Sequence, residues 1–356
     1  MTDLKMAVVG VGALGRHHAR ILSQMPGVRL VAVADSDPRR GQEAAANCRT
    51  DWVADYRTLF DRVDAVSVVV PTVAHWSVAS QFLQRRIPVL VEKPLASTAE
   101  QANALAALAG EQDTLIQVGH VERFNPAWQA AAPFAHHPKY IRAERTSPYT
   151  FRSTDIGVIF DLMIHELDLL LSLNSSPVRS IEAFGIGVMG GGHEDVAQAR
   201  ITFENGCIAD LTSSRISPTV ARSWQIWSAE GCLTIDLHRR EVSRFSPCAA
   251  IMSGASPLDL SRQPGADIEQ LKKDVFGKFL KVEAIPVSEG DALTGELAEF
   301  VHCVKSGGAP QVDGAQAARA VTLAEAVLEK VKTHPWDGHA HGAVGPNPRQ
   351  PRRLAG

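Results

Sequence analysis

The stretch MAVVGVGALG at residues 6–15 runs from a short apolar segment into three glycines with the spacing G-x-G-x-x-G. Residues 6–9 are apolar without interruption, as in a strand that is buried on both faces of a parallel sheet. The segment 14–25 that follows is predicted to be helical. A strand, a glycine-rich turn and a helix in this order predict the first unit of an α/β domain.

The alternation of strand and helix continues as far as residue 119. Further strands are expected at 30–34, 65–70, 89–91 and 115–118, and further helices at 38–47, 74–85 and 98–111. Strand–helix–strand units of this kind make right-handed crossovers and build a doubly wound parallel sheet. We therefore expect residues 1–119 to form a Rossmann domain.

A different pattern begins after Gly119 and predicts an α+β domain at 120–333, built on an open antiparallel sheet. Strand pairs turn around Asn205-Gly206 and Glu230-Gly231, as hairpins do. Helices are expected at 126–135, 158–173, 292–305 and 315–332, a further strand at 140–146, and a loop or lid at 249–266. The tail at 334–356 has no apolar period, and we expect it to be mobile.

Composition excludes several classes of protein. Apolar residues make up 45% and charged residues 21% of the 356 residues, which predicts packed domains. The net charge of −3, with basic residues only in short pairs, argues against nucleic acid as a partner. No apolar run is long enough to span a membrane, and the first residues do not resemble a signal peptide. Five scattered cysteines without a CxxC pair predict a reduced, cytoplasmic protein.

The glycine-rich turn predicts a dinucleotide site. Gly10 permits the tight turn, Gly12 lets the backbone approach a pyrophosphate, and Gly15 lets the helix pack closely on the strand. The pyrophosphate would lie on the unsatisfied amides at the start of the helix, around Ala13 and Leu14. The alternative is a glycine-rich turn without a ligand.

Asp35 ends the second strand 20 residues after Gly15, where a carboxylate accepts hydrogen bonds from the adenosine ribose. Its negative charge would repel a 2′-phosphate and favours NAD. Arg39 and Arg40 lie just beyond and could serve a 2′-phosphate, so NADP remains an alternative. The other interpretation of Asp35 is that it only caps the next helix.

Two segments supply candidate catalytic residues. Glu92-Lys93-Pro94 ends the 89–91 strand, at the sheet edge where ligands of open α/β sheets collect, so Lys93 can act there as an acid or base. The second segment is the helix at 158–173, which is apolar nearly all round yet carries a polar stripe, Asp161, His165, Asp168 and Ser172. Asp161 can orient His165, although a core histidine satisfied by Asp161 is the alternative. Glu166 has no HExxH spacing around it, and we expect no metal.

With these motifs in place, the chain resembles the glucose–fructose oxidoreductase/inositol dehydrogenase/MocA family, essentially over its whole length to Lys332. The resemblance rests on an ordered set of motifs: Gly10-Val-Gly-Ala-Leu-Gly15, Val68-Val-Val-Pro71 with His75, Glu92-Lys-Pro94, and Asp161-x-x-x-His165-x-x-Asp168. The resemblance implies hydride transfer between a sugar or polyol carbinol and nicotinamide.

By the same resemblance, Lys93, Asp161 and His165 are the catalytic residues and contact the substrate. Pro71, His75, Glu92 and Lys93 then belong to the cofactor site. The family also implies a C-terminal sheet that pairs subunits into homodimers or homotetramers.

A narrower likeness lies in Gly119-His-Val-Glu-Arg-Phe-Asn-Pro126, which is similar to the UDP-N-acetylglucosamine 3-dehydrogenases of this family. It implies a nucleotide-sugar substrate, with Arg123 and Asn125 near it. Arg123, Arg145 or Arg152 could hold a diphosphate, whereas a solvated surface arginine is the alternative for each. Two other functions stay open: a free-sugar or polyol dehydrogenase, and a cofactor-sensing regulator that would not need Lys93 and His165.

Overall fold

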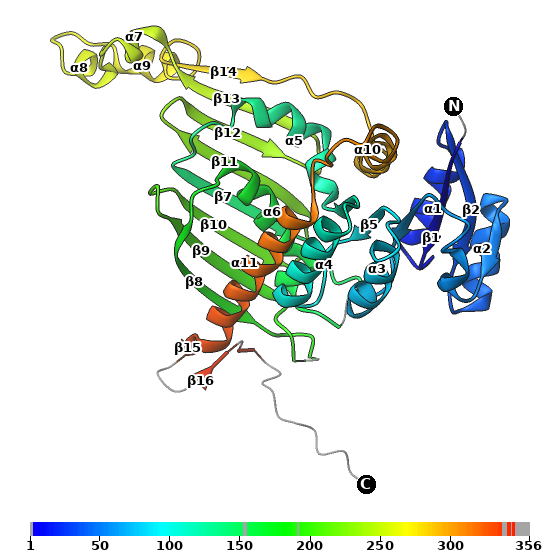
Figure 1. Ribbon diagram of the computed structural model, residues 1–356. Coiled ribbons are helices and arrows are strands. Elements are labelled where there is room, and N and C mark those ends of the chain that lie inside the picture. The colour runs from blue at the N-terminus through cyan, green and yellow to red at the C-terminus, as the bar shows by residue number, and fades with distance from the viewer. Residues whose placement is uncertain (1–2, 152–154, 191, 337–339, 343, 346–356) are drawn as a thin grey trace. The chain divides into compact units, whose positions relative to one another are not determined.

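The computed structural model describes residues 3–151, 155–190, 192–336, 340–342 and 344–345 (Figure 1). The chain forms two compact units. The first comprises residues 1–125, 167–169 and 290–326, and the second comprises residues 126–166, 170–289 and 327–356. Each unit has its own sheet.

The first unit contains the predicted doubly wound sheet. All its strand pairs are parallel, in the order β3-β2-β1-β4-β5-β6. The strands are β1 (Leu4–Val9), β2 (Val28–Ala34), β3 (Asp51–Val53), β4 (Ala65–Val68), β5 (Val89–Glu92) and β6 (Ile116–Gly119). The connecting helices are α1 (Gly15–Gln24), α2 (Pro38–Cys48), α3 (His75–Leu83) and α4 (Ala99–Glu111). The Rossmann fold is confirmed, and the unpredicted β3 is a short edge strand of mixed burial.

The core of the first unit includes a helix from far along the chain. α10 (Ala292–Ser306) places Leu297, Phe300 and Val301 in one apolar cluster with β1 and α1. Because α10 completes this core, the unit extends beyond the predicted boundary at residue 119 and takes in residues 290–326. A sequence pattern shows that a helix has an apolar face but not which sheet that face covers.

The second unit contains a mostly antiparallel sheet of eight strands, in the order β14-β13-β12-β11-β7-β10-β9-β8. The strands are β7 (Tyr140–Thr146), β8 (Val178–Ile186), β9 (Val196–Phe203), β10 (Ile208–Ser214), β11 (Ala221–Ser228), β12 (Gly231–Asp236), β13 (Glu241–Pro247) and β14 (Leu280–Ala284). Only β7 and β10 pair in parallel. Burial alternates along β9 and β10, so one face of the sheet is in the core and the other is open and polar.

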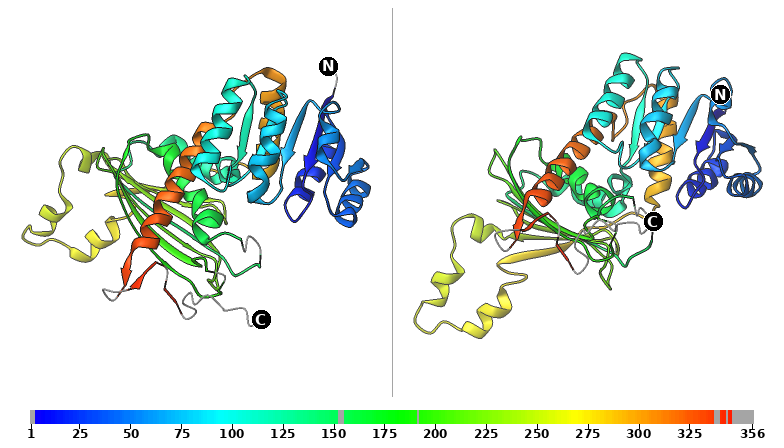
Figure 2. Two further views of the ribbon diagram at one scale, coloured as in Figure 1. Left: turned by 60° about the horizontal axis from the view of Figure 1, so that its bottom comes forward. Right: turned by 90° about the horizontal axis from the view of Figure 1, so that it is seen from below.

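Three predictions about local structure need correction. The loop expected at 249–266 contains the short helices α7 (Ala249–Met252) and α8 (Pro257–Ser261), which with α9 (Ile268–Asp274) extend from the end of the β13–β14 hairpin (Figure 2). The helix expected at 158–173 begins as a π-helical turn, Ile159–Met163, before α6 (Ile164–Leu173). In the tail, β15 (Pro335–Trp336) pairs with β16 (Ala340–His341), and the remainder of the expected mobile segment lies mostly outside the described residues.

The remaining helices agree with the sequence. α5 (Pro126–Ala131) contacts β12 and β13, and α11 (Gly314–Thr333) is the last long helix. Among the described residues, no helix combines the length and hydropathy that crossing a membrane requires.

Replacing Phe300 by Ala tests whether α10 is part of the Rossmann core. Phe300 is fully buried in the apolar cluster, so we expect Phe300→Ala to lower the free energy of unfolding by about 3–5 kcal/mol. Phe276→Ala is the matched control, because Phe276 is 64% exposed and its loss should cost under ~1 kcal/mol. Equal effects of the two variants in denaturant unfolding would contradict the assignment.

Candidate functional site

The turn between β1 and α1 has the geometry that the three glycines predict. Gly10 has φ +88°, and a Cβ atom there would lie 2.5 Å from the carbonyl oxygen of Val69. A Cβ atom at Gly15 would lie 1.9 Å from the carbonyl oxygen of Gly10, so α1 approaches the turn as closely as a glycine allows. At Gly12 nothing lies within 4 Å of that position. The surface over Gly12 is therefore open to a ligand.

The beginning of α1 can receive an anion. The helix has no side-chain cap and no acidic residue in its first turn. Its first amides, next to Ala13 and the 41%-exposed Leu14, carry the positive end of the helix dipole. The turn and the helix start together fit the pyrophosphate of a dinucleotide.

Asp35 lies next to this turn and is tied to it. Its carboxylate accepts hydrogen bonds from the backbone N–H of Val11 (3.0 Å) and Asp37 (2.9 Å) and from Arg40 Nη2 (3.0 Å). Burial alone would raise the pKa of Asp35, but the hydrogen bonds from Arg40, Asp37 and Val11 outweigh it and lower that pKa below its usual value. Asp35 is thus an anion. Arg40, considered above as a partner for a 2′-phosphate, is engaged by Asp35, and Asp37 is the residue that caps α2.

Lys93 follows the end of β5 and is half-buried. The preceding Glu92 accepts a hydrogen bond from the backbone N–H of Lys93 (3.1 Å). The ring of His75, which is 1% exposed, has Nδ1 2.8 Å from the carbonyl oxygen of Pro94 and Nε2 2.9 Å from that of Val70. His75 therefore lies between the loop after β4, which includes Pro71, and the turn that carries Lys93, and a neutral ring donates a hydrogen bond to one of these two carbonyls. Burial lowers the pKa of His75.

Arg123 is not a solvated surface arginine, which was one of its two interpretations. Its guanidinium is buried and forms a two-pronged ion pair with Asp168, with Nε 2.6 Å and Nη2 3.0 Å from the carboxylate oxygens. The ring of His120 lies 3.9 Å from the same carboxylate. Burial lowers the pKa of His120. Asn125 is also buried and donates a hydrogen bond to Glu122 (2.9 Å).

In the second unit, Asp161 and His165 lie on consecutive turns, Asp161 in the π-helical turn and His165 at the start of α6. His165 is 8% exposed and Asp161 is half-buried. Next to His165, Glu166 is fully buried and paired with Arg145, whose Nε lies 2.7 Å from one carboxylate oxygen. Arg145 is therefore no surface arginine either, and Arg152 lies outside the described residues.

Two residues of the predicted polar stripe, Asp168 and Ser172, have surroundings that differ from those of Asp161 and His165. Asp168 belongs to the first unit with Arg123, whereas Ser172 is exposed to solvent. His120 and Glu122 lie in the motif at 119–126, which predicts no role for either, and no motif points to His18 of α1, although it is completely buried. A signal for His18 does exist, because it stands three residues after Gly15 and so shares the helix face that packs on the sheet.

Two family models match consecutive parts of the chain. The model described as an oxidoreductase family with an NAD-binding Rossmann fold matches residues 4–120. The model described as the GFO/IDH/MocA C-terminal domain matches residues 123–234.

Several characterised proteins are similar. UDP-N-acetylglucosamine 3-dehydrogenase of Acidithiobacillus ferrooxidans is 31% identical over 326 residues, covering 91% of this chain and 96% of that protein. Its solved structure covers 93% of this chain and 98% of its own, with a TM-score of 0.81. scyllo-Inositol 2-dehydrogenase (NAD(+)) of Bacillus subtilis is 28% identical, covering 61% of this chain and 68% of that protein. A levoglucosan dehydrogenase in complex with NADH and levoglucosan, 16% identical with a TM-score of 0.77 over 93% of this chain and 97% of that one, shares the fold.

Alanine at two of the glycines separates ligand binding from folding. Gly12→Ala places a methyl group in open space, so we expect unchanged thermal stability but at least ~10-fold weaker NAD binding, because the methyl group occupies the approach of the pyrophosphate. Gly15→Ala collides with the backbone of Gly10 and should lower the melting temperature by several degrees.

The control is Gly110→Ala in α4, where nothing lies within 4 Å and neither property should fall. Calorimetric titration with NAD and thermal unfolding measure the two properties. Undiminished NAD affinity in Gly12→Ala would remove the pyrophosphate from this turn.

Proposed function

Because this chain belongs to the glucose–fructose oxidoreductase/inositol dehydrogenase/MocA family of NAD-dependent oxidoreductases, we propose that it oxidises the 3-hydroxyl of UDP-N-acetylglucosamine or of a closely related nucleotide sugar. The observation that carries this proposal is the match to the Acidithiobacillus ferrooxidans enzyme, which extends through both units at 31% identity. The reaction takes place in the cytoplasm.

The nucleotide-binding unit supports NAD rather than NADP. Asp35 remains ionised beside the glycine-rich turn, where a 2′-phosphate would meet a negative charge. Arg40, one of the two arginines that could compensate, already pairs with Asp35. When bound, NAD supplies the acceptor for the carbinol hydride.

The protein residues move a proton and orient the substrate. His165 takes the proton of the reacting hydroxyl, Asp161 orients the His165 ring, and Lys93 binds the same hydroxyl from the end of β5. Two buried ion pairs follow His165 in the sequence: Glu166, the next residue, is held by Arg145, and Asp168, one turn later, by Arg123. These pairs support a role for α6 as a fixed carrier of the imidazole, which general acid–base catalysis requires.

The arginines that were candidates for a diphosphate take a different part in this proposal. Arg123 and Arg145 each hold a buried carboxylate, so they stabilise the site rather than contact the nucleotide. Asn125 positions Glu122 in the same way. Lys93, Asp161 and His165 then remain as the residues that contact the reacting sugar.

A free polyol is the second candidate substrate, because scyllo-inositol 2-dehydrogenase and several inositol 2-dehydrogenases are similar over half of the chain or more. We further propose that the open polar face of the eight-stranded sheet joins subunits into a homodimer or homotetramer. Its polar residues are interleaved with buried ones, as in Ala197, Gln198, Ala199 and Arg200 of β9.

Substrate choice is tested by NADH formation. UDP-N-acetylglucosamine should be oxidised with a kcat/KM at least ~100-fold above that of N-acetylglucosamine, myo-inositol and scyllo-inositol, because only the nucleotide sugar engages the whole site. UDP-glucose, which lacks the acetamido group, is the matched control. Faster turnover of a free polyol would replace this proposal with the second candidate.

The catalytic roles are tested by Lys93→Ala, His165→Ala and the double variant. Each single change should lower kcat by about 10²–10⁴-fold, the usual contribution of acid–base catalysis, while NAD affinity stays near wild type. Residues that act on one hydroxyl as a unit lose much of their effect together, so the double variant should be little worse than the poorer single one. Fully multiplicative losses would show that Lys93 and His165 act independently.

A further inference from the structure

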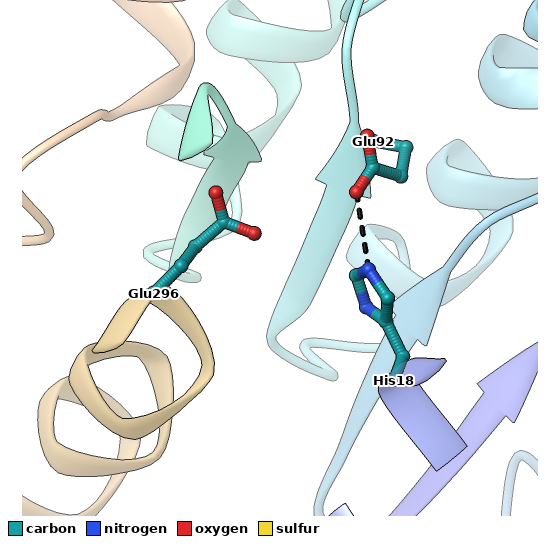
Figure 3. A group of neighbouring side chains, drawn as sticks. All are labelled: His18, Glu92 and Glu296. Carbon is teal, nitrogen blue, oxygen red and sulfur yellow. Dashed lines mark ion pairs between the residues drawn. The ribbon is translucent and has the colours of Figure 1, made fainter. Parts of the chain in front are cut away.

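Three ionisable side chains meet inside the first unit, away from its surface. His18 of α1 places Nε2 3.1 Å from Glu92 Oε1 of β5, and Glu296 reaches toward both of them from α10 (Figure 3). One ligand atom of each residue lies within 4.8 Å of the others. The residues are 0%, 6% and 0% exposed, in the order His18, Glu92, Glu296.

His18 and Glu92 are each held by a second partner. His18 Nδ1 lies 2.9 Å from Ser67 Oγ of β4, and the second oxygen of Glu92 accepts the hydrogen bond from the N–H of Lys93. His18 Nε2 lies 3.1 Å from Glu92 Oε1, but among the described residues it makes no aligned hydrogen bond, so the contact between the two side chains is one of charge and proximity.

Glu296 is different. Among the described residues, neither of its carboxyl oxygens has a hydrogen-bond partner, although its own backbone carbonyl accepts from Gln117 Nε2 (3.0 Å). The side-chain oxygen of Gln117, on β6, is also buried without a partner. An ionised carboxylate in this position would be very costly, because a buried charge needs a counter-charge or several hydrogen bonds.

Several charged groups lie on the elements around Glu296. Glu92 faces it from β5, His18 from α1 and Glu299 from one turn further along α10, whereas Gln117 of β6 is uncharged. The 3-10 turn Val121–Phe124, which also contacts α10, carries Glu122 and Arg123. Burial, the charge of Glu92 and that of Glu299 all raise the pKa of Glu296 well above its usual value. Burial acts on Glu92 in the same direction, but the neighbouring His18 and the charge of Lys93 lower the pKa of Glu92.

We propose that Glu296 is held as a neutral carboxylic acid and that the two buried carboxyl groups, Glu92 and Glu296, carry one proton between them. Glu92 stays ionised and anchors the turn that bears Lys93, and Glu296 supports it without adding a second charge. Glu296 is thus a positioning residue, which acts on Lys93 through Glu92. This last step rests on the catalytic role proposed for Lys93.

A divalent cation is the other way to neutralise two carboxylates and a histidine. A buried structural zinc ion has four protein ligands, whereas only three residues, His18, Glu92 and Glu296, come together here among the described residues, which favours the proton. The complete burial of His18 and Glu296 also disfavours Mg²⁺, which usually keeps several water ligands.

Infrared spectroscopy tests the neutral acid directly. At pH 7 the wild-type protein should show the carbonyl stretching band of a protonated carboxylic acid, and this band should be absent from Glu296→Gln. Glu111→Gln, a change at an exposed residue of α4, is the control and should leave the band intact. A wild-type spectrum without the band overturns the proposal, whatever the activity of the protein.

Stability against pH gives an independent measure. A carboxyl group whose pKa is raised in the folded state keeps its proton while the unfolded chain loses it, so stability falls as pH rises above the unfolded pKa of about 4.3. The difference between the melting temperature of Glu296→Gln and that of the wild type should therefore increase by about 2–4 °C, in favour of Glu296→Gln, from pH 5 to pH 8. If the melting temperatures of the two proteins changed with pH by the same amount, Glu296 would not hold a proton in the folded state that it loses in the unfolded chain, and the proposal would be wrong.

Metal analysis and kinetics complete the test. If the purified enzyme contained one equivalent of Zn²⁺ or Mn²⁺ and Glu296→Gln did not, a cation and not a proton would neutralise the cluster, and the proposal would be wrong. Glu296→Ala should lower kcat at least ~10-fold with little change in the KM for NAD, and Glu296→Gln should recover most of that loss because the amide has the size of the protonated acid and, like it, carries no charge.

Equal losses in Glu296→Gln and Glu296→Ala would mean that a charge is needed at this position, which contradicts the proposal. The proposed function fails separately, if Lys93→Ala keeps its activity while the infrared band is present.

Discussion

The contact between α1 and the turn after β1 is the constraint on which the rest of the nucleotide-binding unit depends. A side chain at residue 15 would overlap the carbonyl of Gly10, so the helix can lie where it does only with glycine there. This close approach has two consequences. It leaves the first amides of α1 without a cap, facing the open space over Gly12. It also brings His18, one turn further on, across β4 and against Glu92 at the end of β5. The same packing that prepares the pyrophosphate site thus fixes a partner for the residue before Lys93.

The region around Lys93 is built from several separate segments. Glu92 binds the N–H of Lys93, His75 lies between the carbonyls of Pro94 and Val70, and Gly119 leaves room for the Glu92 carboxylate, which would lie 3.0 Å from a Cβ atom at that residue. The hydrogen bond from the Lys93 N–H goes to a charged group in a partly buried position, where such a bond is stronger than in water and its loss costs more. A lysine at this turn is therefore presented by a rigid frame. Such rigidity is what catalysis needs, since a small displacement of a reacting group costs a large part of the rate.

Most of the first unit could be predicted from the sequence because its strands and helices are each indicated by a short local pattern. Continuous apolar runs, glycine spacing and an acid at the end of the second strand are all readable within 35 residues, and the structure agrees with them. The parts that escaped prediction depend on contacts between distant residues. α10 was recognised as a helix, but its place in the Rossmann core depends on a sheet nearly 300 residues earlier in the chain. Arg123 looked like one of many arginines until its partner Asp168 was known. A π-helical turn at Asp161 likewise leaves no mark on the apolar pattern, because the helix around it is apolar on nearly every side.

Buried carboxylates occur in both units. The group that neutralises each one indicates whether the carboxylate fixes an element in place or can exchange a proton. Asp168, Glu166 and Asp195 are each paired with an arginine, and such pairs fix an element in place with little tendency to exchange protons, since a guanidinium does not lose its proton in proteins. Glu92 and Glu296 have no arginine. They face a histidine and each other, which are groups that do exchange protons near neutral pH. An exchangeable buried charge beside Lys93 can respond to the protonation state of the site, which suits an enzyme that takes a proton from a hydroxyl. The arginine pairs elsewhere supply the rigidity, so this one cluster is free to carry a proton without loosening the fold.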